Sequence, residues 1–298
     1  MTTSHLVRRA ADADYRAADA LAPGSSGYTR WCAVDDTVPG AVHTGFGVCR
    51  LEPGGTVPAH VHSFEESVYV LDGEVVLQVP EAAFRLGPGD YGLVPVGVPH
   101  TLRNTGSEEA RWAEMLAPQP RPEYGADTFR VPDVAQIEPV SVDPRDPRTR
   151  SFGNIRPEHM DPAKQSQNLL AVSASMRTAL LVYGGITVKM MVDSDLGAVL
   201  STMFMVQYDP DGKASPHDHP FEETYLILEG GVDATFDGEK YRLEPGDLAW
   251  AGAGCAHSFA ATGEPVRWLE TQAPQPPGRH SYRFARDWDY LKQVLELP

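Results

Sequence analysis

Two stretches of this chain combine histidine and glutamate at a spacing that could hold a metal ion. Each begins with a His-x-His pair and carries a glutamate four residues after the second histidine. The residues are His60, His62 and Glu66 in the first stretch and His217, His219 and Glu223 in the second. Because alternate residues of a strand point to the same side, each pair aims two imidazoles into one interior.

One more histidine follows each stretch at the end of a glycine-rich turn, His100 in the first case and His257 in the second. Three neutral imidazoles and one carboxylate form a mixed nitrogen and oxygen site suited to a first-row divalent transition metal. Fe(II) or Mn(II) is favoured. Affinity alone would select metals later in the first transition row, so the availability of each metal ion decides which one is bound. Ni, Co and Zn are also compatible with these ligands.

The two stretches belong to one tandem repeat. His217 lies 157 residues after His60, and the same offset separates Glu66 from Glu223 and His100 from His257. The motif APQP, which follows the first copy, also recurs after the second. Internal repetition of this kind predicts two similar structural units, each with its own metal site.

The spacing resembles that of the cupin superfamily, G-x5-H-x-H-x3-E-x6-G followed by G-x5-P-x-G-x2-H-x3-N. The first copy matches the second motif in full, at Gly89, Pro95, Gly97, His100 and Asn104, whereas the second copy departs from it at Gly252 and Ala261. The resemblance implies an all-β fold of two tandem double-stranded β-helix barrels (cupin or jelly-roll barrels), a bicupin, with a few short helices. It leaves the reaction open, because this fold hosts many chemistries.

The strand that starts at each glutamate should turn alternate residues inward. The inner residues are then Glu66, Val68 and Val70 in the first copy and Glu223, Tyr225 and Ile227 in the second. Tyr225 could therefore reach a bound substrate, with core packing as the other interpretation. Glu65 and Glu222 should point outward, as surface groups or as supports for the ligands.

Other neighbours of the ligands are expected to be structural. Phe64 and Phe221 should pack under the turn between the two ligand-bearing strands. Cys255 suits a small buried residue in the turn beside the metal, with a reactive thiol as the alternative. Trp250 and Met205 are candidates for lining the second barrel.

The chain is long enough for two domains of ordinary size. We expect an N-terminal arm over residues 1–27 with a possible short helix, packed on the other half or on a second subunit. Barrels should cover residues 28–120 and 176–275, joined by a connector over 121–175 that is rich in Pro, Asp and Arg. A short helix near residues 163–176 and an amphipathic helix within 276–298 complete this plan.

Composition limits the partners. Lys and Arg number 25 against 41 Asp and Glu, a net charge of −16 that argues against nucleic acid or an anionic membrane as a partner. The three cysteines show no C-x-x-C spacing, and neither a signal peptide nor an apolar run of membrane-spanning length is evident. We expect a cytoplasmic protein that binds a small-molecule substrate and forms a homodimer or a higher homo-oligomer.

Cupins of this type suggest several functions. The first is a dioxygenase acting on a small oxygenated metabolite, in which Glu66 or Glu223 serves as the base that deprotonates the substrate. The second is a hydrolase of amide or amidine bonds, similar to ureidoglycine aminohydrolases. Decarboxylation of oxalate-like acids is disfavoured, because Val57 and Ala214 stand where such bicupins carry an arginine. A non-enzymatic binding or storage role is a third possibility.

Overall fold

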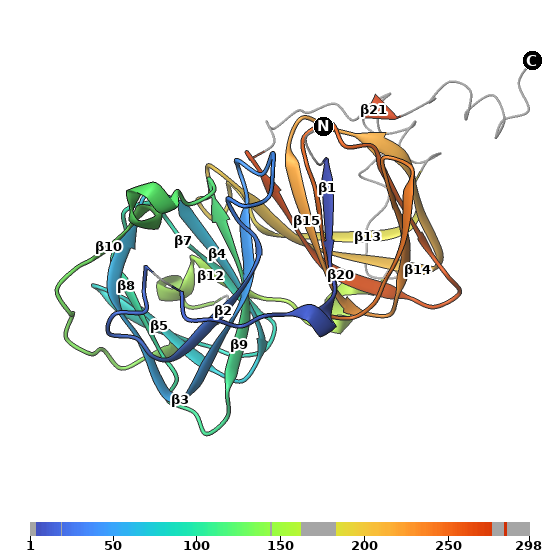
Figure 1. Cartoon of the computed structure of the whole chain (residues 1–298). Coiled ribbons are helices and arrows are strands. Elements are labelled where there is room, and N and C mark those ends of the chain that lie inside the picture. Colours follow the sequence, from blue (N-terminus) through green and yellow to red (C-terminus); the bar gives the residue numbers. More distant parts are fainter. Residues whose placement is uncertain (1–3, 19, 144, 162–182, 276–282, 285–298) are drawn as a thin grey trace, which may run out of the picture.

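The computed structural model describes residues 4–18, 20–143, 145–161, 183–275 and 283–284. The chain forms two curled antiparallel-rich sheets that lie side by side, one from each half of the sequence (Figure 1). The helices of the described residues are short 3-10 turns at Ala10–Asp12, Pro122–Asp127, Pro147–Thr149 and Pro157–Met160. The predicted all-β bicupin architecture with a few short helices is confirmed. In the described residues, no helix is long and apolar enough to cross a membrane.

The first sheet, here called barrel 1, begins at residue 26. Its strands are β2 (Ser26–Val34), β3 (Gly45–His62), β4 (Glu65–Asp72), β5 (Val75–Val79), β6 (Ala82–Leu86), β7 (Asp90–Val94), β8 (His100–Arg103) and β9 (Ala110–Ala117), followed by the short strands β10 (Thr128–Arg130), β11 (Val140–Ser141) and β12 (Phe152–Asn154). The long strand β3 pairs with β2, β8, β9 and β10, so it connects more strands of barrel 1 than a regular strand with two neighbours would.

The second sheet, barrel 2, repeats this plan. Its strands are β13 (Tyr183–Val192), β14 (Thr202–Asp218), β15 (Glu222–Glu229), β16 (Val232–Phe236), β17 (Glu239–Leu243), β18 (Leu248–Ala251), β19 (His257–Ala261), β20 (Val266–Ala273) and β21 (Arg283–Phe284). The long strand β14 pairs with β13, β19, β20 and β21, as β3 does with its own neighbours. The tandem repeat seen in the sequence therefore corresponds to one repeated strand topology.

The register of these strands sets the positions of the ligands. His60 on β3 pairs with His100 on β8, and His217 on β14 pairs with His257 on β19. Gly73 and Gly230, the last glycine of each first motif, both have a φ of +67°. A Cβ at Gly73 would lie 2.3 Å from the Glu109 carbonyl oxygen, so only glycine fits this turn.

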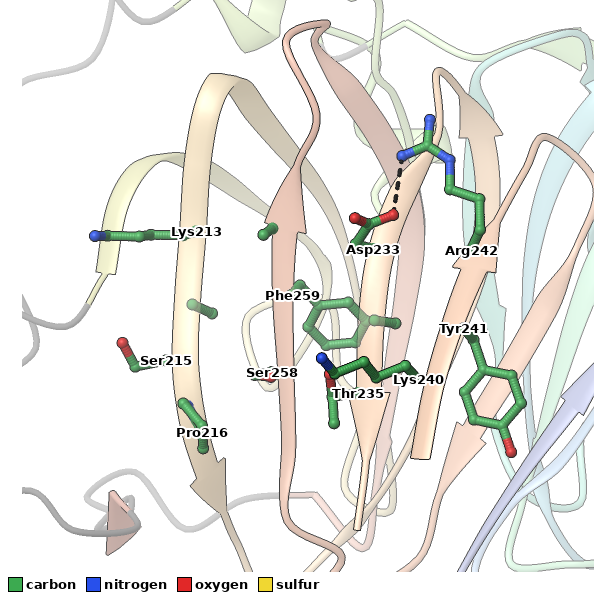
Figure 2. A pocket seen from close by; sticks show the side chains of 13 residues that line it. Lys213, Ser215, Pro216, Asp233, Thr235, Lys240, Tyr241, Arg242, Ser258 and Phe259 are labelled. Atoms are coloured by element: carbon green, nitrogen blue, oxygen red, sulfur yellow. Dashed lines mark hydrogen bonds and ion pairs between the residues drawn. The ribbon is translucent and has the colours of Figure 1, made fainter. Parts of the chain in front are cut away.

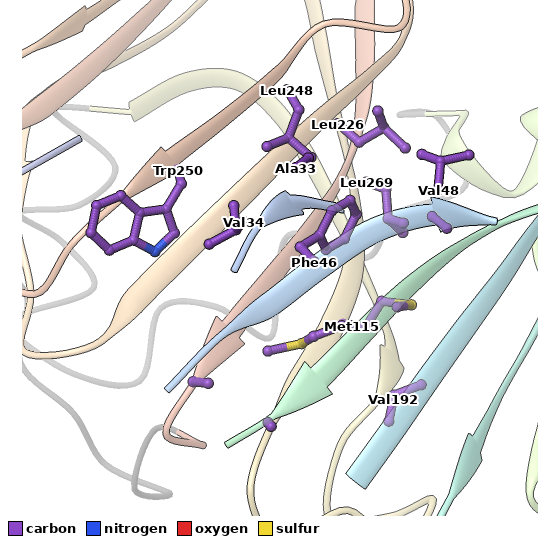
Figure 3. Packing of buried hydrophobic residues seen from close by; sticks show 14 of the residues in the cluster. Ala33, Val34, Phe46, Val48, Met115, Val192, Leu226, Leu248, Trp250 and Leu269 are labelled. Atoms are coloured by element: carbon purple, nitrogen blue, oxygen red, sulfur yellow. The ribbon is translucent and has the colours of Figure 1, made fainter. Parts of the chain in front are cut away.

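A buried apolar cluster joins the two barrels (Figure 3). Phe46 and Met115 contribute from barrel 1, and Leu226 and Leu269 from barrel 2. Trp250 and Met205, expected to line the second barrel, lie in this cluster instead. Their side chains take the faces of β18 and β14 that point away from the barrel 2 interior, because the alternate residues Ala251 and Phe204 occupy the inner faces.

The N-terminal residues cross from one barrel to the other. Strand β1 (His5–Arg8) adds to the edge of barrel 2 by antiparallel pairing with β18 (Figure 1). The Asp247 carboxylate fixes the following residues, since it accepts hydrogen bonds from Arg9 Nη1 at 2.6 Å and from the backbone N–H of Ala10 at 2.9 Å. The expected short helix is reduced to one 3-10 turn, because the edge of barrel 2 offers the arm a strand partner.

The connector packs on the outer face of barrel 1. Gln78 donates from Nε2 to the Ala135 carbonyl oxygen at 2.7 Å, and Arg103 donates to that of Ile137 at 3.1 Å. Its arginines form ion pairs, as between Arg121 and Asp127 at 2.5 Å. The helices predicted near residues 163–176 and within 276–298 lie outside the described residues, and the predicted domain boundaries stay predictions.

Candidate metal centres

In barrel 1 the four predicted ligands come together in the interior. His60, His62, Glu66 and His100 each offer one ligand atom, and these atoms lie within 4.8 Å of one another. All four side chains are buried. Glu66 Oε2 lies 3.0 Å from His62 Nε2 and 3.1 Å from His100 Nε2, so the carboxylate faces two imidazoles at once.

The backbone orients every one of these imidazoles in the same way. In both barrels each histidine Nδ1 lies 2.7–3.1 Å from the carbonyl oxygen of a residue two positions away. The six histidines are His60, His62, His100, His217, His219 and His257. A carbonyl oxygen only accepts hydrogen bonds, so Nδ1 must carry a proton and Nε2 is the ring nitrogen that faces the centre.

A phenylalanine ring stacks on the second histidine of each His-x-His pair. Phe64 stacks on His62 with 4.0 Å between ring centroids, and Phe221 stacks on His219 with 3.9 Å. Each ring is nearly parallel to its histidine and each phenylalanine is buried. The same two residues also supply the carbonyl oxygens that accept from His62 and His219. The prediction that both phenylalanines are packing residues was correct. Their direct contacts with His62 and His219 were not predicted.

Barrel 2 assembles its ligands less symmetrically. His217, His219 and His257 form a compact group with ligand atoms within 4.8 Å of one another, and Glu223 is not a member of that group. Glu223 Oε2 lies 2.7 Å from His219 Nε2 and 3.4 Å from His257 Nε2. Two further donors hold this carboxylate: the Tyr225 hydroxyl and Gln272 Nε2, the latter at 2.6 Å from Oε1.

The donor set fits a divalent cation. Where Nδ1 carries the proton, the Nε2 of His100 directs a lone pair at Glu66 Oε2, and two acceptors at 3.1 Å repel unless a proton or a cation lies between them. Burial, and then the neighbouring His100, lowers the pKa of His60 to about 3, and burial with His257 does the same for His217. Both imidazoles are therefore neutral at pH 7, as metal ligation requires.

A second buried carboxylate stands beside each ligand glutamate. Burial raises the pKa of Glu114 to about 7, and nearby Glu66 acts in the same direction against the opposing charge of Arg30. In barrel 2, burial and the charge of Glu223 raise the pKa of Glu270 well above its usual range. Sequence reasoning missed both residues, although the repeated Trp-x-Glu of β9 and β20 was an available signal.

Glu65 and Glu222 point outward from their own barrels, as strand alternation predicted, but they are not surface groups. Each side chain is buried and accepts hydrogen bonds from the backbone of the opposite barrel. The alternation itself is correct, since both residues point away from their own interiors. The neighbouring barrel covers that side, however, so it is not exposed to solvent.

A hollow of about 510 Å3 lies on the outer face of barrel 2 rather than at the histidines (Figure 2). Lys213, Lys240 and Arg242 line it together with Asp233. Ser258 also lines it, on the opposite strand face from its neighbour His257. On barrel 1 the corresponding face lies under the connector that bonds to Gln78 and Arg103.

Comparison with known proteins agrees with this description. A model of the cupin domain matches residues 47–116 and 204–271, one match in each barrel. Protein SchB of Streptomyces halstedii is 36% identical over 108 residues, which cover 35% of this chain and 78% of that protein. The tetracenomycin polyketide synthase protein TcmJ of Streptomyces glaucescens is 34% identical over 103 residues, with coverage of 34% and 69%. The chain therefore belongs to the cupin family, as a bicupin.

Solved structures resemble both barrels together. A variant of Bacillus subtilis oxalate decarboxylase has a TM-score of 0.67 at 15% identity and covers all of this chain, which in turn spans 85% of that protein. A variant of salicylate 1,2-dioxygenase of Pseudoaminobacter salicylatoxidans, in complex with gentisate, has a TM-score of 0.61 at 17% identity, with coverage of 86% and 71%. At such identities the likeness concerns the fold, and the chemistry must be argued from the site.

Proposed function

We propose that this bicupin is a metal-dependent dioxygenase that acts on a small oxygenated metabolite, with Fe(II) or Mn(II) as its metal. The observation that carries the proposal is the orientation of the imidazoles, whose Nε2 atoms converge beside a buried carboxylate in each barrel. A bound metal of this kind would polarise a substrate oxygen and bring O2 next to the substrate, which supplies the electrons that reduce O2. The ligands would be His60, His62, Glu66 and His100, and His217, His219, Glu223 and His257.

We place turnover in barrel 2, because Tyr225 and Gln272 are polar there. The barrel 1 positions that correspond to them are Val68 and Leu116, whose strands pair in the same register. Behind Val68 the apolar side chains of barrel 1 leave no space for even a water molecule. Barrel 1 would then bind a metal among apolar neighbours. Barrel 2 would be the site where polar side chains beside the metal can act on a substrate.

The residues of barrel 2 have distinct roles in this proposal. Glu223 would take the proton of an enolic or phenolic substrate hydroxyl, as a buried carboxylate in reach of the reacting atoms can. The Tyr225 hydroxyl donates to Glu223. Once Glu223 has taken the proton, this hydroxyl would donate its hydrogen bond to the anionic substrate oxygen and stabilise it. Because TcmJ is a polyketide synthase protein by name, aromatic or enolisable polyketide-like compounds are the first substrates to try.

A hydrolase of amide or amidine bonds is the alternative. The arrangement that favours it is the same Glu223, which could instead take a proton from an attacking water. Such a reaction would need neither O2 nor a redox-active metal. The dioxygenase would therefore consume O2, whereas the hydrolase would release ammonia without consuming O2.

Two measurements test these proposals together. Elemental analysis of protein purified without chelator should find iron or manganese, at about two ions per chain if both sites bind. O2 uptake with catechols, gentisate and β-diketones should then exceed the rate of a metal-free control. Release of ammonia from ureido or amide substrates without O2 uptake would support the hydrolase. No metal after reconstitution would overturn both proposals and leave a non-enzymatic binding protein.

A further inference from the structure

Each barrel holds a backbone segment of the other with one buried glutamate. Glu65 on β4 accepts hydrogen bonds from the backbone N–H groups of Val199 at 2.6 Å, Leu200 at 3.0 Å and Ser201 at 3.2 Å. The Ser201 hydroxyl donates to the same carboxylate at 3.2 Å. We call this set of contacts the Glu65 clamp.

The duplication produces a matching Glu222 clamp in the opposite direction. Glu222 on β15 accepts from the backbone N–H groups of Val42 at 2.9 Å, His43 at 3.0 Å and Thr44 at 3.1 Å. Trp250 Nε1 donates to it at 3.3 Å. Carboxylates that accept several N–H bonds away from water make strong, well-defined contacts, so the two clamps fix the barrels against each other.

Each clamp glutamate directly precedes a ligand glutamate on the same strand. Glu65 is followed by Glu66 on β4, and Glu222 by Glu223 on β15. A metal that fixes the position of Glu66 therefore also fixes the strand that carries Glu65. Because close-packed interiors transmit small displacements, the segment held by Glu65 is affected by the state of the barrel 1 site.

The Glu65 clamp continues by polar contacts to the ligand of the other barrel. Ser201 is followed by Thr202, whose hydroxyl donates to Gln272 Oε1 at 3.3 Å. Gln272 Nε2 in turn donates to Glu223 Oε1 at 2.6 Å. The strand register agrees, since Gln272 pairs with Thr202 on one side and with Glu223 on the other.

Among the residues that the structure describes, the Glu222 clamp has no such continuation. Thr44 is followed by Gly45, which has no side chain, and the residue paired with Gly45 is the apolar Leu116. Leu116 then pairs with Glu66 but offers it no hydrogen bond. Two clamps of the same design thus differ in whether a polar contact reaches the metal ligand beyond them.

We infer that metal binding at the two sites is energetically coupled and that the Glu65 clamp, through Thr202 and Gln272, carries the coupling. This inference rests on the proposed metal-binding function. Glu65 is a positioning residue: it acts on the barrel 2 site through Gln272, which orients Glu223. Coupling between two sites is reciprocal, so each metal changes the affinity for the other by the same factor.

The test uses Co(II), whose visible absorption reports ligand geometry, titrated into metal-free full-length protein. The coupling factor is the ratio of the barrel 2 Kd in His60→Ala protein, which lacks barrel 1 binding, to the Kd in protein with both sites. It is measured in three backgrounds: the natural sequence, Glu65→Gln and Glu222→Gln. The last is a matched control, because it breaks an equivalent clamp that ends at Gly45 and Leu116.

We expect a coupling factor of about 5 or more in the natural sequence, at the low end of known couplings. Glu222→Gln should keep this factor, whereas Glu65→Gln should reduce it to about 1 and alter the Co(II) spectrum of barrel 2. If Glu65→Gln does not fold, Gln272→Leu removes the last contact while leaving both clamps intact, and should also give about 1.

Two outcomes would overturn the inference. One is Co(II) binding at both sites with a factor near 1 in the natural sequence. The other is an equal loss of coupling in Glu65→Gln and Glu222→Gln, which would indicate that any loosened interface suffices. Both leave the metal-binding proposal standing. If no variant or natural protein binds Co(II), the metal-binding proposal fails and the coupling fails with it.

Discussion

Barrel 1 and barrel 2 share one backbone plan but surround their histidines with different side chains. Where barrel 2 has Tyr225 and Gln272 at the ligand carboxylate, barrel 1 has Val68 and Leu116. The ligand framework depends on strand register and on carbonyl oxygens, which any sequence of this fold can supply. In the proposed function the groups that set reactivity are single side chains, and these differ between the two copies.

The difference extends to the second buried carboxylate. In barrel 1, Arg30 Nε lies 2.7 Å from Glu114 Oε2, and the guanidinium lies over Gly47, where a Cβ would come within 2.9 Å of it. In barrel 2, Glu270 accepts instead from Trp268 Nε1 at 2.9 Å. Because Gly47 has no side chain, barrel 1 has room for the buried Arg30 guanidinium. The two sites therefore differ in charge as well as in hydrogen bonding.

Removing one ligand histidine from each barrel in turn should have the largest effect. We expect both His60→Ala and His217→Ala to lose one bound metal ion per chain by elemental analysis. Turnover should fall roughly 10³-fold or more in His217→Ala and much less in His60→Ala, because we place the reaction in barrel 2. His159→Ala, at an exposed position, is the control. The reverse order of activities would move the reaction to barrel 1.

Tyr225→Phe should separate the proposed chemistry from metal binding. The variant keeps the ring but loses the hydroxyl that donates to Glu223. We expect kcat to fall by about 10²-fold at unchanged metal content, the usual order for losing a group that stabilises a developing charge. Tyr241→Phe, at a tyrosine of the same barrel whose hydroxyl bonds to His5 and Glu239 instead of Glu223, should leave kcat unchanged. Equal kcat for both variants would assign Tyr225 to packing.

The two clamp glutamates should prove nearly equal in stability even though they differ in coupling. Glu65→Gln and Glu222→Gln each weaken several hydrogen bonds to a buried carboxylate, at a cost of about 2–4 kcal/mol. Denaturant unfolding of the chelated proteins would measure this cost. The exposed Glu81→Gln should cost less than about 0.5 kcal/mol. A clamp variant as mild as Glu81→Gln would show that its barrel is held mainly by the apolar cluster.

Metal-free protein should also show a pH dependence of its stability. Glu114 has a pKa of about 7 in the fold against an ordinary value of 4.5, so the folded state holds a proton that the unfolded chain releases. Its contribution to stability is therefore present below pH 4.5 and is lost as the pH rises to about 7. Glu114→Gln cannot ionise, so the Tm advantage of the natural protein over this variant should shrink between pH 5 and 8. A Tm difference independent of pH would contradict the raised pKa.

The sequence predicted the fold and the residues that meet in each candidate metal centre, because both follow from local rules. Strand alternation placed Val68, Tyr225 and the ligand glutamates inward, and the 157-residue offset predicted two equal units. What could not be predicted depends on how the two units face each other. Glu65, Glu222 and Trp250 all lie on the faces that meet between the barrels, and no periodicity in one strand shows what will cover its outer side. The strand β1 at the edge of barrel 2 was missed for the same reason.

That strand has a consequence for the order in which the protein can be built on the ribosome. Residues 5–8 are synthesised before either barrel, and their partner β18 follows about 240 residues later. Strand β1 therefore has no pairing partner until β18 has been made, and such long-range pairing is among the slowest kinds of contact to form. A fragment that began at barrel 2 would lack this strand and would expose the β18 edge to pairing with other chains. Changes that prevent β1 from pairing with β18 should therefore reduce the soluble yield of the protein.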